Sequence, residues 1–69
     1  MTKMQEARLA AGLSQSQLAK AAGINFRQCQ KLDNGERSIN RAMAITVVKI
    51  AGALGCRVED LMEDEKEDL

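Results

Sequence analysis

Two short helical segments separated by a glycine constrain the fold of this chain more than any other feature. Residues 14–33 read SQSQLAKAAGINFRQCQKLD. Ser14 and Gln17 have the spacing of a capping box, in which the hydroxyl and the amide each satisfy an unpaired backbone N–H. Gly23 ends the first helix after two turns, and Asn25 is a good N-cap for the second. Helices this short are not stable alone, so we expect the rest of the chain to hold them.

The helical spacing of apolar residues predicts three further helices around this pair. Gly12 ends the first of them, and Asn40 is a candidate N-cap for the most hydrophobic one, which we expect to be buried on more than one side. The β-branched run ITVV would suit a strand, but so short a chain offers no partner strand. We therefore predict an all-α fold. The five expected helices cover residues 3–11, 15–22, 26–33, 42–54 and 58–62.

The size of the chain allows one domain. With 69 residues, only about 60% of the unfolded surface is buried on folding. We assign residues 1–62 to a helix-turn-helix domain, with the helix-turn-helix proper at 14–33, and residues 63–69 to an acidic tail expected to be flexible. Cys29 and Cys56 fit neither a zinc site nor a disulfide framework, so we expect free thiols in a reducing compartment.

The charge is unevenly distributed along a chain whose net charge is zero. Residues 1–58 carry nine Lys or Arg against three acids, whereas residues 59–69 carry seven acids and one Lys. A basic body with an acidic end is typical of proteins that bind nucleic acid. An ordinary solvated surface with a frayed acidic end is the alternative explanation of the same pattern.

An enzyme is the function class that the residues support least. The chain has no His, no cluster with metal-ligand spacing, no glycine-rich phosphate loop and no Cys beside a base. We expect no catalytic residue, no metal and no cofactor. The N-terminus lacks a long apolar run and nothing approaches the length of a membrane span, so we expect a cytoplasmic protein with no membrane partner.

The motifs LSQSQLAKAAGINFRQCQKLDNGER and VVKIAGALGCRVEDLM resemble the Cro/repressor-type (XRE) helix-turn-helix family over residues 4–62. The L-S-Q entry, Gly23, the acid-x-Gly end at 33–35 and the A-L-G at 53–55 all fall in register. The resemblance implies a five-helix, lambda-repressor-like fold. It also implies a sequence-specific transcriptional regulator, a repressor that reads the major groove of a double-stranded DNA operator with residues 26–33 as a homodimer.

Residue roles follow from the same resemblance. It implies base contacts from Asn25, Phe26, Arg27, Gln30 and Lys31. It implies phosphate contacts from Gln15, Gln28, Arg37 and Arg41. Arg27 is the first candidate for base reading, because a guanidinium can pair bidentately with guanine O6 and N7. Lys31 can read guanine or hold a phosphate, and Gln28 and Gln30 can address adenine or the backbone.

Three further expectations concern structure and partners. The family pairs an Arg of the first helix with an acid at the end of the recognition helix, which predicts a structural ion pair between Arg8 and Asp33. Phe26 is unusual for the family and suits either a thymine methyl group or a protein contact. The apolar residues of 58–62, or of the end of the helix before them, either form a dimer interface or close the core. An antitoxin or accessory protein-binding module is the alternative function.

Overall fold

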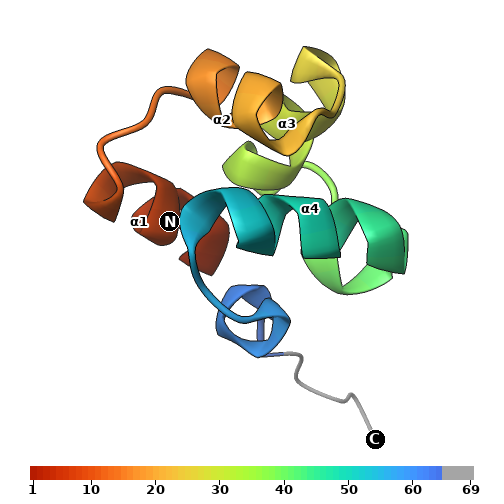
Figure 1. Cartoon of the computed structure of the whole chain (residues 1–69). Helices are drawn as coiled ribbons and strands as arrows, with labels where there is room; N and C mark the ends of the chain where they lie inside the picture. The colour runs from red at the N-terminus through yellow and green to blue at the C-terminus, as the bar shows by residue number, and fades with distance from the viewer. Residues whose placement is uncertain (65–69) are drawn as a thin grey trace, which may run out of the picture.

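The chain folds into four α-helices and two short 3-10 helices (Figure 1). The computed structural model describes residues 1–64, and these contain no strand. The elements in order are α1 (Lys3–Ala10), α2 (Gln15–Ala22), α3 (Phe26–Asn34), η1 (Ile39–Arg41), α4 (Ala44–Leu54) and η2 (Val58–Leu61). The all-α prediction is confirmed for the described residues, but the fifth expected helix is a 3-10 helix rather than an α-helix.

The local signals that define α2 and α3 act as predicted. The Ser14 hydroxyl accepts the Gln17 backbone N–H at 3.0 Å, and the Gln17 side chain accepts the Ser14 backbone N–H at 2.9 Å. Gly23 ends α2 with a left-handed φ of 69°, a conformation that costs other residues more. The Asn25 side-chain oxygen then accepts the backbone N–H of Arg27 at 2.8 Å. Both helix starts and the turn between them are therefore fixed by adjacent residues.

The connector between α3 and α4 differs from the prediction. Asn40 does not cap α4, because it lies inside η1 and α4 begins at Ala44. The Asn40 amide instead donates to the Glu63 backbone carbonyl at 2.8 Å, and its oxygen accepts the Glu63 N–H at 2.9 Å. Asn40 thus joins two segments that lie 23 residues apart.

The core draws at least one residue from every element. In Figure 1, α2 and α3 lie on one side of α4 and η2 lies on the other. The buried apolar residues are Met4, Leu18, Ala19, Ala22, Cys29, Leu32, Ile39, Val47, Ile50, Ala51 and Leu61. Ala19 is small where α2 packs on its neighbours, which allows the backbones to approach. The core therefore holds α2 and α3 by contacts with α4 and α1.

One side of α4 is not covered by any part of the chain that the structure describes. Ile45 is 54% exposed and Val48 is 52% exposed, and Met43 just before the helix is 69% exposed. The helix is buried on more than one side, as predicted, because α2 packs on one side and η2 on another, but it is not enclosed all round. The described elements are too few to surround the most apolar helix completely.

The start of the predicted tail contacts the body of the domain. The Glu63 carboxylate accepts the Lys3 backbone N–H at 2.6 Å, at the N-terminus of α1 where a negative charge is favourable. The Lys3 ammonium also lies 3.7 Å from the exposed Asp64 carboxylate. The remainder of the predicted tail, residues 65–69, lies outside the described residues.

Candidate nucleic-acid interface

Helix α3 buries one side and presents the other to solvent. Cys29, Leu32 and Asp33 are buried. The side chains for which we expect base contacts are exposed or half-buried. Asn25, Phe26, Arg27 and Lys31 are exposed, and Gln30 is half-buried. The structure thus leaves all five of these residues accessible at the surface.

Asp33 connects the three N-terminal helices. Its side chain is fully buried, and its Oδ1 lies 2.9 Å from the Arg8 Nε of α1. Its other oxygen accepts the side-chain amide of Gln15 in α2 at 2.8 Å. Arg8 in turn donates through Nη1 to the Leu13 carbonyl at 2.7 Å. A buried carboxylate needs such partners to offset its desolvation. These bonds fix the orientation of α3 relative to α1 and α2.

Gln15, for which we expect a phosphate contact, points its amide into the protein. One amide N–H goes to Asp33, and the same nitrogen lies 2.9 Å from the Asn34 side-chain oxygen. A side-chain amide has two N–H donors, so both are used at the end of α3. The first backbone N–H groups of α2, at Gln15 and Ser16, have no partner within the helix. At the N-terminus of α2, these two backbone N–H groups are therefore the donors that remain for an outside partner.

Two more expected contact residues have partners within the chain. The half-buried Gln28 reaches α4, where its amide nitrogen lies 3.5 Å from the Thr46 hydroxyl. Asn25 uses its side-chain oxygen to cap α3, which leaves its NH₂ group as the donor for an outside partner. Gln28 therefore stabilises the contact between α3 and α4 in the free protein.

Arg37 and Arg41 come together beside Gln28. Both arginines are exposed and line one cavity of about 340 Å³, with Leu32 and Met43 among the other lining residues. Three ion pairs occur within residues 1–64, formed by Lys3–Asp64, Arg8–Asp33 and Arg57–Asp60. Arg37 and Arg41 belong to none of these described pairs, and neither do Arg27 and Lys31. Among residues 1–64, these four positive charges are therefore not neutralised by an ion pair.

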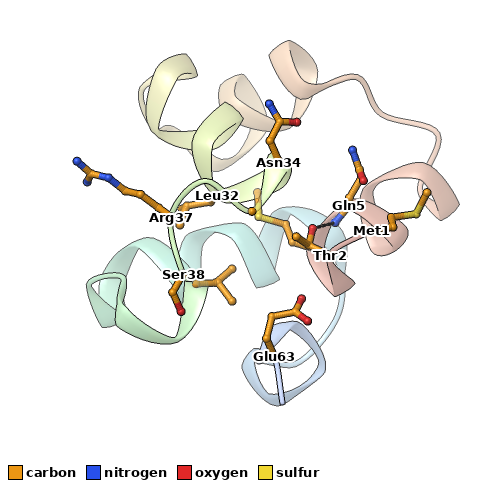
Figure 2. Close-up of a pocket in the computed structure, with 11 residues that line it drawn as sticks. Met1, Thr2, Gln5, Leu32, Asn34, Arg37, Ser38 and Glu63 are labelled. Carbon is orange, nitrogen blue, oxygen red and sulfur yellow. Dashed lines mark hydrogen bonds between the residues drawn. The ribbon is translucent and has the colours of Figure 1, made fainter. Parts of the chain in front are cut away.

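A larger cavity of about 500 Å³ lies between the N-terminus, the end of α3 and Glu63 (Figure 2). Two of its polar side chains bond within the chain: Thr2 donates to the Asp33 carbonyl at 2.8 Å, and Glu63 accepts from the Lys3 backbone N–H. Figure 2 shows the Arg37 guanidinium directed away from this cavity. Within residues 1–64, no group of three or more His, Cys, Asp or Glu side chains could hold a metal ion.

The two cysteines are free thiols in the structure. Cys29 is buried, and its sulfur lies 3.6 Å from the Gln15 carbonyl oxygen. Burial raises the pKa of this thiol above its ordinary value, the Asp33 charge raises it further, and the Arg8 charge acts in the opposite direction. Burial, followed by the charge of Asp60, also raises the pKa of Cys56. Neither environment favours a nucleophilic thiolate at neutral pH.

The exposed apolar residues at the start of α4 were missed as a candidate interface at the sequence level. Our candidates lay in residues 58–62 or at the end of the preceding helix, but Leu61 is fully buried and closes the core. Val58 and Met62 instead line a cavity of about 240 Å³ with Ala44 and Val48. Periodicity could not separate the two sides of α4, because nearly every position from 44 to 54 is apolar.

Comparisons with known proteins agree with this geometry. The family model described as helix-turn-helix matches residues 4–61. A solved structure, the restriction-modification controller protein C.AhdI from Aeromonas hydrophila, superposes with a TM-score of 0.76. It is 28% identical, and the match covers 87% of this chain and 86% of that one. No curated protein gave a significant match. No helix among the described residues is both long and apolar enough to cross a membrane.

Proposed function

Because the chain belongs to the helix-turn-helix family, in its Cro/repressor (XRE) type, we propose that it is a sequence-specific transcriptional regulator that reads the major groove of double-stranded DNA with α3. One observation carries this proposal. Helix α3 buries Cys29, Leu32 and Asp33 and leaves the residues expected to contact bases accessible. The similarity to a restriction-modification controller protein supports a regulatory role. We propose that this activity is binding without a catalytic step, in the cytoplasm.

Base reading depends on the outer side of α3. A major groove about 12 Å wide admits one α-helix. Arg27 offers a bidentate donor pair for guanine, and Gln30 lies three residues further on, at the spacing of side chains that share a helix side. Lys31 can read guanine or hold a phosphate at the other end of the helix. The Asp33 network supports this role because it fixes α3 before DNA arrives, so little ordering entropy is lost on binding.

Phosphate contacts position the helix without reading sequence. The two arginines at the cavity beside Gln28 are our first candidates. At α2, the backbone N–H groups of Gln15 and Ser16 suit a phosphate oxygen. The Gln15 side chain would have to release Asp33 or Asn34 to donate outward, so we assign it to holding α2 against α3.

A homodimer is part of the proposal. One module of this size offers limited contact area, and two half-sites about one helical turn apart would supply affinity. The exposed apolar side of α4, comprising Met43, Ile45 and Val48, supports an interface there, because such a surface is costly to leave in water. Repression would follow when the dimer occupies an operator and excludes polymerase.

The experiment that tests the proposed function measures binding of the purified chain to labelled duplex DNA across a range of salt concentrations. We expect binding whose affinity falls linearly with the logarithm of salt concentration, because phosphate neutralisation releases counterions. Absence of binding at low salt would contradict the proposal. It would favour the alternative, a protein-binding module of the antitoxin or accessory type, for which the half-exposed Phe26 is a candidate contact.

A further inference from the structure

Phe26 is left at the surface although it is the only aromatic residue of the chain. It is the first residue of α3, and 45% of it is exposed. It belongs neither to the apolar core nor to the partly buried apolar residues that pack on that core. A phenyl side chain is among the groups that gain most from burial, so folding alone does not account for its position.

The residues next to Phe26 in α3 are polar, and the start of the helix is capped. Asn25 caps the first turn of α3 by accepting the backbone N–H groups of Arg27 and Gln28 at 2.8 and 3.4 Å. Gln30 lies four residues after Phe26 and therefore shares its side of the helix. The ring thus belongs to a capped helix start whose nearby residues, Arg27 and Gln30, offer positive charge and hydrogen bonds.

These neighbours suit DNA better than an apolar protein surface. The exposed apolar residues Met43, Ile45 and Val48 lie at α4 and offer a protein partner a larger apolar surface. In helix-turn-helix complexes the N-terminal residues of the recognition helix contact the base edges. In the major groove, the base edges present one apolar group, the 5-methyl of thymine.

We propose that Phe26 determines specificity by packing its ring against the 5-methyl group of one thymine in each half-site. This inference rests on the proposed function, since it needs α3 to lie in the major groove. This apolar contact would favour thymine at one position, in addition to the bases selected by the hydrogen bonds of Arg27 and Gln30. Burying one methyl group corresponds to an affinity gain of about fourfold per half-site.

The test uses a duplex that the wild-type chain selects from a random pool. Each thymine is replaced in turn by deoxyuridine, symmetrically in both half-sites, which removes the methyl and keeps every hydrogen-bonding group of the base. We expect one position at which the change weakens wild-type binding about fourfold per half-site. The Phe26→Ala variant should bind the thymine and the uracil duplex with equal affinity.

Leu9→Ala is the matched control, because Leu9 is an apolar side chain of α1 that is 52% exposed. This variant should keep the full penalty for uracil. Circular dichroism should give the same thermal midpoint for Phe26→Ala as for the control, since neither side chain belongs to the buried core.

Two results would overturn the inference while the proposed function stands. The first is a wild-type chain that binds tightly yet is indifferent to uracil at every position. The second is a Phe26→Ala variant that still binds the uracil duplex more weakly than the thymine duplex, or that selects the same DNA sequence as the wild type. Either result would be expected if Phe26 contacted a protein instead of DNA. A wild-type chain that binds no DNA would instead overturn the proposed function and this inference together.

Discussion

The side-chain amide of Gln15 donates to the carboxylate of Asp33 over 2.8 Å and thereby ties the first residue of α2 to the end of α3. The other carboxylate oxygen of Asp33 lies 2.9 Å from the Arg8 Nε of α1. One buried acid therefore joins three helices, of which α2 consists of only two turns. The position of α3 therefore depends on this acid as well as on apolar packing.

The first prediction concerns the buried ion pair. Arg8→Ala should lower the free energy of unfolding by about 3 kcal/mol or more, because it leaves the buried Asp33 charge without its ionic partner. Urea denaturation measures this loss. Arg57→Ala is the matched control, since its pair with Asp60 is exposed and should contribute less than about 1 kcal/mol. An Arg8→Ala variant of unchanged stability that no longer binds DNA would identify Arg8 as a DNA contact instead.

The sequence predicts the elements that local chemistry determines. Ser14, Gly23 and Asn25 act within three residues of themselves, so their caps and turns follow from residue type and spacing. Asn40 shows where such reasoning fails. Its partner Glu63 lies 23 residues away, and no local pattern distinguishes that contact from a helix cap.

In the candidate site, too, local features can be predicted from the sequence and contacts between distant segments cannot. The exposed side of α3 can be predicted, because helical spacing separates Cys29 and Leu32 from the outward residues. The inward turn of the Gln15 amide could not be predicted, since Asn34 becomes its neighbour only when α2 and α3 have packed. The exposed side of α4, our candidate interface, was hidden by uniform hydrophobicity. Ile45 and Val48 are exposed because no described element packs over them.

Arg37→Ala and Arg41→Ala should each weaken binding to all DNA sequences by a similar factor. Each change should also make the slope of log affinity against log salt shallower by about one, the expected result of losing one phosphate contact. Fluorescence anisotropy at several salt concentrations gives both quantities. Arg57→Ala is again the control, because η2 lies on the far side of α4 from α2 and α3 (Figure 1). An unchanged slope in both variants would remove the two arginines from the DNA interface.

Val48→Asp should produce a folded monomer. Val48 is 52% exposed, so the charge costs the single chain little, whereas two charges facing each other across a dimer interface are destabilising. Sedimentation equilibrium measures the change in oligomeric state. Leu9→Asp introduces the same charge at an equally exposed position of α1 and should leave the dimer intact. A dimer that survives Val48→Asp would place the interface elsewhere.

Cys29 should make the stability sensitive to alkaline pH. Burial raises the pKa of this thiol in the folded chain above its ordinary value of 9.0. The unfolded chain therefore loses the proton first as the pH rises past about 9, and the free energy of unfolding falls until the folded pKa is passed. Below about pH 9 the thiol is protonated in both states, so its full contribution to the free energy of unfolding is present. In urea denaturation, the free energy of unfolding of Cys29→Ala should fall less between about pH 8 and about pH 10.5 than that of the wild type. Identical pH profiles of the two proteins would show that the Cys29 thiol does not cause the alkaline loss of stability.

Selection of bound duplexes from a random pool shows whether α3 reads DNA sequence. The wild-type chain should enrich one motif with two half-sites about one helical turn apart. The same selection with Arg27→Ala should lose the preference at one guanine of each half-site while the remaining positions persist. A wild-type selection that enriches no motif, or an Arg27→Ala variant with an unchanged motif, would contradict the account.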